Sequence, residues 1–222
     1  MSHTVFNSHL LGDTNTWPLG KLVCVGRNYA EHAAELNNPI PEQPLLFIKP
    51  ATSAVVLQEP VHLPKDVGDV HYETEIALLI GSPLTKAKPE AALEAVVGVG
   101  LALDLTLRDL QTELKKQGHP WERAKAWDGA CPLSDFVPVA EVEDWQELEL
   151  SLAINGIEKQ RGKAKQMLTP IAELLSHISQ TFTLLPGDVV ITGTPAGVGK
   201  LTTGDQLNVQ LTNLIQVTTK VV

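Results

Sequence analysis

Short apolar runs, separated by single glycines and prolines, recur along the chain and predict more strands than helices. Runs rich in Val, Ile, Leu or Thr predict strands at residues 21–26, 45–49, 74–80, 97–106, 147–154, 188–192 and 206–211. Helices are predicted at residues 29–36, 88–96, 108–117 and 169–180. Asn155 and Gly156 predict a hairpin turn, because both residues tolerate positive φ. Strands and helices do not alternate regularly, so we expect an α+β protein of mixed, mainly β architecture.

The composition is that of a folded globular chain. It has 222 residues, of which 43% are hydrophobic and 19% charged. A chain of this length can bury a core without disulfide or metal crosslinks. No internal repeat is present, so we predict one domain over residues 1–222, with residues 1–20 as an N-terminal extension.

The balance of charge narrows the class of partner. A formal net charge of −9 argues against nucleic acid and against an anionic membrane surface. Cys24 and Cys131 lie far apart without a metal-binding spacing, which indicates structural thiols in a reducing compartment. Residues 1–17 lack the pattern of a signal peptide, and no run of about 18 apolar residues occurs. We therefore expect a cytoplasmic protein that contacts neither nucleic acid nor membrane.

Three acidic residues are candidates for a metal site. Glu73 and Glu75 alternate along a predicted strand and therefore share one of its faces. Two adjacent carboxylates repel unless a cation offsets their charge, although a solvated strand face would also accommodate them. Asp104 interrupts an apolar strand, where it is either a third ligand or a core acid bonded to backbone or to Arg108. Oxygen donors alone favour Mg²⁺ or Mn²⁺ over Zn²⁺, but the sequence does not bring Asp104 to the glutamates.

His32 and Glu35 are the candidate proton-transfer pair. At a spacing of three residues on a predicted helix they share a face, so the carboxylate can orient the imidazole as a general base. A surface helix that carries the two residues incidentally is the alternative. The segment lacks the His-Glu-x-x-His pattern of zinc proteases.

Several other polar residues are candidates for binding an anionic substrate. Lys49 ends an apolar strand and Lys125 lies in a segment of uncertain structure, and either is otherwise a solvated charge. Arg108 and Gln111 share a face of a helix that begins just after Asp104. The loop around Thr194 departs from the phosphate-binding loop pattern, so it is either a backbone N–H cradle for a carboxylate or a plain turn.

Six motifs occur together in one order: GRNYAEHAAE, FIKP, HYETE, LALDLTLRDLQ, RAKAWD and ITGTPAGVG. In this order and spacing the chain resembles the fumarylacetoacetate hydrolase family, and its length resembles the short branch of acylpyruvases and oxaloacetate decarboxylases. The resemblance implies a mixed β-sandwich roll that forms a homodimer. It also implies Mg²⁺ or Mn²⁺ bound by Glu73, Glu75 and Asp104. His32 and Glu35 would form the general-base dyad, on a segment that orders as a lid over the substrate. Lys125 would contact the substrate, and the remaining pocket positions would be Arg27, Lys49, Arg108, Gln111 and Thr194.

The resemblance implies an enzyme that acts on a small 2-oxo acid. We expect hydrolysis of the C–C bond of an acylpyruvate such as acetylpyruvate or fumarylpyruvate, which gives pyruvate and a carboxylic acid. Oxaloacetate decarboxylation, oxaloacetate keto–enol tautomerisation, and isomerisation or decarboxylation of a hydroxyhepta-dienedioate are alternatives, because all require the same chelating site. A non-enzymatic protein that binds a metal or a 2-oxo acid is the alternative from another class.

Overall fold

A computed structural model describes residues 6–222 of the chain. The first five residues of the N-terminal extension expected at residues 1–20 lie outside the described residues. The rest of it forms a two-stranded antiparallel sheet of β1 (Asn7–Ser8) and β2 (Trp17–Pro18). Residues on and beside these strands, among them Leu10 and Leu19, cover one face of the main sheet.

The main sheet has eight strands and mixed polarity. Their order is β4-β3-β14-β7-β8-β10-β5, with β11 also paired to β8. β14 runs parallel to β3, and β10 runs parallel to β5, whereas the other pairs are antiparallel. The strands are β3 (Lys21–Gly26), β4 (Leu45–Pro50), β5 (Ala54–Val56), β7 (Thr74–Ile80), β8 (Val96–Leu103), β10 (Cys131–Leu133), β11 (Val137–Pro138) and β14 (Val189–Ile191).

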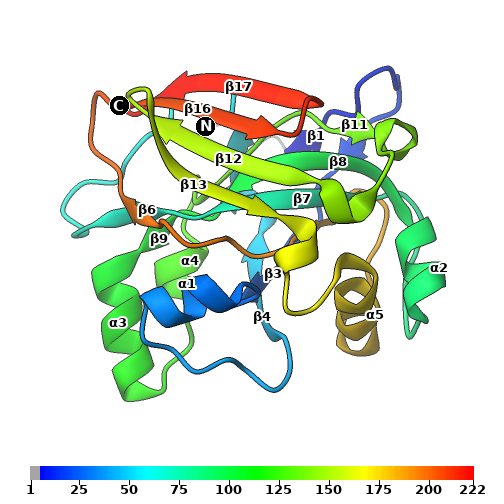
Figure 1. The fold of residues 1–222 in the computed structure, drawn as a ribbon, viewed down its shortest axis with the longest axis horizontal. Coiled ribbons are helices and arrows are strands. Elements are labelled where there is room, and N and C mark those ends of the chain that lie inside the picture. Colours follow the sequence, from blue (N-terminus) through cyan, green and yellow to red (C-terminus); the bar gives the residue numbers. More distant parts are fainter. Residues whose placement is uncertain (1–5) are drawn as a thin grey trace.

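A second sheet of four antiparallel strands packs on β7 and β8 (Figure 1). Its order is β13-β12-β16-β17, with β12 (Glu149–Ile154), β13 (Ile157–Lys163), β16 (Gln206–Leu211) and β17 (Ile215–Lys220). Asn155 and Gly156 form the turn between β12 and β13, both at positive φ, as the sequence predicts. A third, smaller sheet joins β15 (Gly199–Lys200), β6 (Val70–Tyr72) and β9 (Thr106–Leu107).

The central strand β7 is buried on both faces. Ile76, Leu78 and Ile80 belong to the core between the two large sheets. Ala77 and Leu79 belong to the second core, which the N-terminal residues cover. Alternation along the strand thus supplies both cores, and the carboxylate of Glu75 lies on the face of Ala77.

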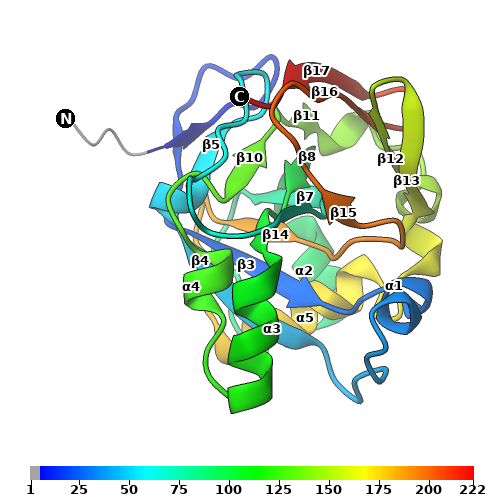
Figure 2. The same cartoon turned by 90° about the vertical axis from the view of Figure 1, so that its left-hand side faces the viewer.

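The helices lie around the lower part of the main sheet in both views (Figures 1 and 2). They are α1 (Ala30–Glu35), α2 (Pro89–Glu94), α3 (Arg108–Gln117), α4 (Glu122–Lys125) and α5 (Ile171–Thr181). α2 and α5 pack on each other, and α3 packs on α4. Within residues 6–222, no helix is both long and apolar enough to span a membrane.

The predicted mixed, mainly β architecture is confirmed, with differences at particular elements. The strand expected at residues 97–106 ends at Leu103, and Thr106 begins the separate strand β9. The break falls at Asp104, whose N–H donates to the carbonyl of Glu73 outside both strands. The strands β6 and β10 and the helix α4 were not predicted, because each has only three or four residues. The strand β17 was also not predicted, although its exposed and buried positions alternate. Cys24 and Cys131 are buried free thiols, as expected.

Candidate active site

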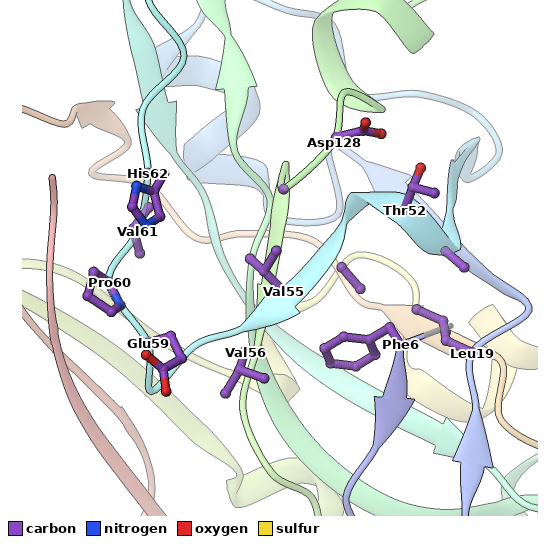
Figure 3. A pocket seen from close by; sticks show the side chains of 13 residues that line it. Phe6, Leu19, Thr52, Val55, Val56, Glu59, Pro60, Val61, His62 and Asp128 are labelled. Atoms are coloured by element: carbon purple, nitrogen blue, oxygen red, sulfur yellow. The ribbon is translucent and has the colours of Figure 1, made fainter. Parts of the chain in front are cut away.

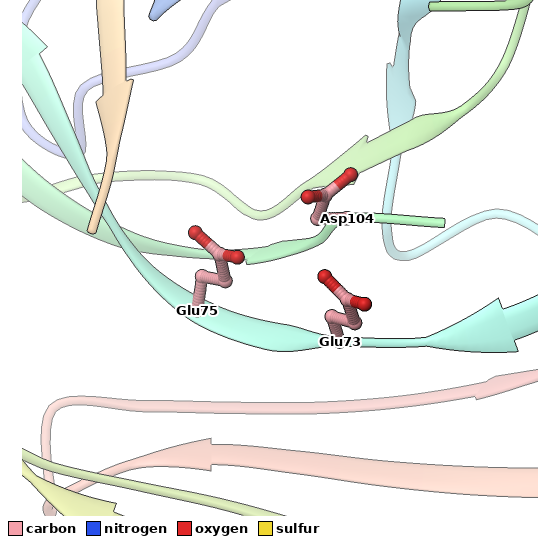
Figure 4. A group of neighbouring side chains, drawn as sticks. All are labelled: Glu73, Glu75 and Asp104. Carbon is pink, nitrogen blue, oxygen red and sulfur yellow. The ribbon is translucent and has the colours of Figure 1, made fainter. Parts of the chain in front are cut away.

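Three carboxylates meet where β7 begins and its antiparallel neighbour β8 ends. Ligand oxygens of Glu73, Glu75 and Asp104 all lie within 4.8 Å of one another, and Figure 4 shows the three side chains converging. Each residue is at most 6% exposed. The oxygen-only donor set and its burial suit a hard divalent cation.

Strand pairing brings Asp104 to the two glutamates. In the antiparallel ladder, Glu75 lies opposite Ala102 and Thr74 lies opposite Leu103. The next residue along, Asp104, therefore comes beside Glu73, and its N–H donates to the Glu73 carbonyl at 2.8 Å. The third corner of the triad is thus set by the register of two strands that are distant in the sequence.

Cationic side chains surround two of the three acids. The ammonium of Lys125 lies 2.7 Å from Glu73 Oε2 and 2.6 Å from Asp104 Oδ2, and Arg108 also contacts Glu73. Burial opposes ionisation of Glu73, but Lys125 and Arg108 outweigh it and hold its pKa below the ordinary range. Burial would lower the pKa of Lys125, yet Asp104 and Glu73 raise it. Lys125 is therefore a fixed ammonium group beside the triad.

Glu75 is the acid without a cationic partner among residues 6–222. Its Oε2 accepts the N–H of Gly193 at 2.7 Å. Burial, Asp104 and Glu73 all raise its pKa well above the ordinary value. A divalent cation would offset this uncompensated charge. Glu73, Glu75 and Asp104 thus fit a site for Mg²⁺ or Mn²⁺.

Lys49 lies behind the triad instead of in front of it. Its side chain is completely buried, and its Nζ lies 2.8 Å from Asp104 Oδ1. It also donates to the backbone carbonyl of Ala130 at 3.0 Å and to that of Lys125. These contacts hold Asp104 and the end of α4 in place, and they leave Lys49 outside the wall of the cavity that faces the triad.

The predicted proton-transfer pair, His32 and Glu35, lies on α1. His32 is 5% exposed, and its Nδ1 lies 3.5 Å from Glu35 Oε2, which is an ion-pair distance without hydrogen-bond geometry. The Glu35 carboxylate accepts the N–H of Gly197 at 3.1 and 3.2 Å. Burial lowers the pKa of His32 although Glu73 and Glu35 raise it, so the imidazole is neutral near pH 7. A neutral imidazole can accept a proton through Nε2, the nitrogen that does not face Glu35.

Asn28 fixes the entry to α1, a role that sequence reasoning missed. Its Nδ2 donates to the carbonyl of Thr192 at 2.9 Å and to that of Thr169 at 3.1 Å. Its Oδ1 accepts the N–H of Thr169 at 2.8 Å. A buried amide with every polar atom paired is rigid, so α1 is tied to the loop that follows β14.

Gln160 is a second residue that sequence reasoning missed. It is 1% exposed on β13, and its Nε2 donates to Thr194 Oγ1 at 2.7 Å. Its Oε1 accepts the N–H of Thr74, the residue between the two glutamates, at 3.0 Å. A polar residue at a buried position of the hairpin strand was the available signal, but its partners were visible only in the fold.

These side chains enclose a cavity of about 30 Å³. Eight of the eleven predicted site residues line it: Arg27, His32, Glu73, Glu75, Arg108, Gln111, Lys125 and Thr194. Glu35, Lys49 and Asp104 do not line it, but each contacts a residue that does. This space is about the share of one water molecule, so lining side chains must shift to admit a substrate.

A wider cavity of about 800 Å³ lies on another part of the surface (Figure 3). Val55 and Val56 of β5 line it together with Phe6 and Leu19. It contains His62 and Asp128 but no cluster that could hold a metal among residues 6–222. The chemistry therefore belongs to the smaller cavity.

A family model for the C-terminal domain of fumarylacetoacetate hydrolase matches residues 21–222. The chain belongs to the fumarylacetoacetate hydrolase family. Family members with stated activities are similar over nearly the whole chain. Oxaloacetate tautomerase YcgM of Escherichia coli is 50% identical over 194 residues, which cover 87% of this chain and 89% of that protein. The human mitochondrial oxaloacetate tautomerase FAHD1 is 38% identical over 92% of this chain and 93% of its own length.

A solved structure of the family carries a metal. The fumarylpyruvate hydrolase of Pseudomonas aeruginosa, in complex with Mn²⁺ and pyruvate, superposes with a TM-score of 0.93 at 34% identity. The match covers 100% of this chain and 97% of that one. Together with the buried triad, this relative supports the predicted divalent-metal site in a family of metal-dependent enzymes.

Proposed function

We propose that this protein is a divalent-metal-dependent oxaloacetate keto–enol tautomerase. The observation that carries the proposal is one cavity lined by the imidazole of His32 and by two carboxylates of the triad. Tautomerisation requires a chelated 2-oxo acid and one group that moves a proton. The two oxaloacetate tautomerases described above support this choice over the acylpyruvate hydrolysis expected from the sequence.

The residues of the cavity have different roles in the proposed tautomerisation. When bound at the triad, the divalent ion supplies Lewis-acid polarisation of the 2-oxo acid. His32 Nε2 accepts the proton that leaves C3 of the keto form, and the imidazolium formed in this way returns a proton to the C2 oxygen, which gives the enol and regenerates the neutral imidazole. The ammonium of Lys125 lies beside the triad and stabilises the negative charge that develops on this oxygen. Glu35 lies 3.5 Å from Nδ1 and raises the pKa of His32, which favours the protonated imidazole after the proton is taken up.

Hydrolysis of an acylpyruvate is the second candidate. The His32–Glu35 pair favours it, because this arrangement can also take a proton from water. The relative solved with Mn²⁺ and pyruvate is a fumarylpyruvate hydrolase, which also supports hydrolysis, although its sequence identity of 34% is lower than that of the two tautomerases. Decarboxylation of oxaloacetate would use the same chelating site without a water nucleophile.

The experiment compares substrates on chelator-treated protein to which Mn²⁺ is restored. We expect rapid equilibration of the two oxaloacetate tautomers, which the enol absorbance measures. We expect slow or no release of pyruvate from acetylpyruvate and fumarylpyruvate. His32→Ala should reduce tautomerisation by about 100- to 10,000-fold and leave Mn²⁺ binding unchanged. Fast pyruvate release from an acylpyruvate with no effect on oxaloacetate would overturn the proposal in favour of the hydrolase. No metal-dependent turnover of any 2-oxo acid would favour a binding protein.

A further inference from the structure

Lys115 and Arg27 are cationic residues of the cavity wall without a carboxylate partner among residues 6–222. The ammonium of Lys115 lies 5.3 Å from the centre of the Trp121 ring. Arg27 donates a long hydrogen bond of 3.5 Å to the carbonyl of Pro39, and its buried Nε has no partner. By contrast, Arg108 and Lys125 are paired with acids of the triad.

Helix α3 carries one paired and one unpaired cation of the cavity wall, Arg108 and Lys115. Arg108, Gln111 and Lys115 recur at intervals of three and four residues, so they share the helix face that lines the cavity. Arg108 begins the helix beside Glu73, whereas Lys115 lies about 10 Å further along the axis. The cavity wall therefore extends along α3 from a metal end, at the triad, to Lys115.

The positive side chains of the cavity wall outnumber the negative ones. Four cationic side chains and two carboxylates line the cavity, and a divalent ion would add further positive charge. Burial, followed by the neighbouring Arg27 and Arg108, lowers the pKa of Lys115 to about 8. Arg27 is also held at φ 61°, a left-handed conformation that is unfavourable for a residue with a side chain. An anionic ligand would compensate the unpaired positive charges of the two side chains.

We infer that Lys115, together with Arg27, binds a second carboxylate at the end of the substrate away from the metal. This inference rests on the proposed function and assigns the second carboxylate of oxaloacetate to these two residues. Lys115 thereby determines specificity, because a 2-oxo acid with an uncharged far end leaves both cations unpaired. The flexible stem of Lys115 lets its ammonium move from Trp121 toward a ligand as the cavity opens.

The experiment measures two affinities in each of three Mn²⁺-loaded proteins: wild type, Lys115→Met and the control Lys116→Met. Calorimetric titration with oxaloacetate reports on both ends of the cavity, and titration with pyruvate reports on the metal end alone. In Lys115→Met we expect the Kd for oxaloacetate to rise about tenfold or more and the Kd for pyruvate to change by less than about twofold. Lys116 is 67% exposed and pairs with Glu113, so its variant should bind both ligands like wild type.

The outcomes separate this inference from the proposed function. Equal losses for the two ligands in Lys115→Met, or no loss for oxaloacetate, would overturn the role of Lys115. A wild-type preference for oxaloacetate that depends on Lys115, without acceleration of tautomerisation, would overturn the proposed function and support the second carboxylate site. Circular dichroism of each variant verifies that the fold is retained.

Discussion

The side-chain amide of Gln160 donates a hydrogen bond of 2.7 Å to the hydroxyl of Thr194. The same side chain accepts the N–H of Thr74, so one residue of the four-stranded sheet holds both the glutamate strand and the Thr194 loop. Gln160→Leu leaves these buried groups unpaired, which should lower the free energy of unfolding by about 1–3 kcal/mol. It should also reduce kcat, because Thr194 loses its position in the cavity wall.

Gln216 provides the matched control for this prediction. It is exposed on β17 of the same sheet, so Gln216→Leu should leave stability and kcat unchanged. Chemical denaturation and steady-state assays of both variants are the measurements. A Gln160→Leu protein with wild-type kcat would show that the position of Thr194 does not affect turnover.

The pH dependence of activity should report on His32. Burial lowers its pKa below the ordinary value of 6.5, and the neighbouring carboxylates of Glu73 and Glu35 act in the opposite direction. Because the imidazole accepts a proton only when neutral, kcat/KM should stay level down to pH 6.5 and decrease below the lowered pKa. Glu35→Gln removes a group that raises this pKa, so the acidic decline should move to lower pH.

Glu31 is exposed on the same helix and provides the control. Glu31→Gln should leave the profile in its wild-type position. An acidic decline that begins above pH 6.5, or one that moves to higher pH in Glu35→Gln, would contradict the assignment of His32 as the base.

Metal binding should stabilise the fold through Glu75. At about 100 times its Kd, Mn²⁺ should raise the free energy of unfolding by about 2.7 kcal/mol if it binds only the folded state. Glu75→Gln removes one ligand charge while Glu73 and Asp104 keep Lys125, so the protein should fold but lose this stabilisation. Thermal unfolding with and without Mn²⁺ measures the effect, with exposed Glu141→Gln as the control. An equal response to Mn²⁺ in Glu75→Gln would place the metal elsewhere.

Lys49 should be more important for stability than any exposed lysine. Lys49→Met leaves the buried Asp104 with one cation fewer, and breaking a buried pair in this way costs about 3–5 kcal/mol. Mn²⁺ should restore part of the loss, because it also compensates the charge of Asp104. Lys200→Met removes an ion pair whose members are 56% and 43% exposed, and it should leave stability unchanged. Denaturant unfolding of the two variants distinguishes these cases, and similar losses would contradict the prediction.

The homodimer expected from the family resemblance stays a prediction, and β5 is where we expect the contact. This strand is an edge of the main sheet in the described part of the chain, and its Val55 and Val56 are 38% and 43% exposed. An open edge beside exposed apolar side chains favours association (Figure 3). Val56→Lys should convert dimers to monomers in analytical ultracentrifugation, whereas Ile157→Lys, at a 62% exposed hairpin position, should not. A monomeric wild-type protein would overturn this expectation.

Local periodicity determined much of the fold and part of the site. The apolar run at residues 74–80 predicted β7 with its correct bounds, and the alternation of side chains along a strand placed Glu73 beside Glu75. The helical period predicted α3 and placed His32 near Glu35. Such patterns are readable because neighbours along one strand or helix face are fixed by backbone geometry alone.

The tertiary structure decided which of these groups meet. Asp104 joins the glutamates through the register of β7 on β8, which no single segment specifies. Lys49 turned inward behind Asp104, and Gln160 reached across from another sheet. The helical period does place Lys115 on the face of Arg108, but only the packed cavity shows that it lacks an acidic partner. The physical reason is that a segment's own periodicity fixes its faces, whereas pairing and packing between distant segments fix what each face touches.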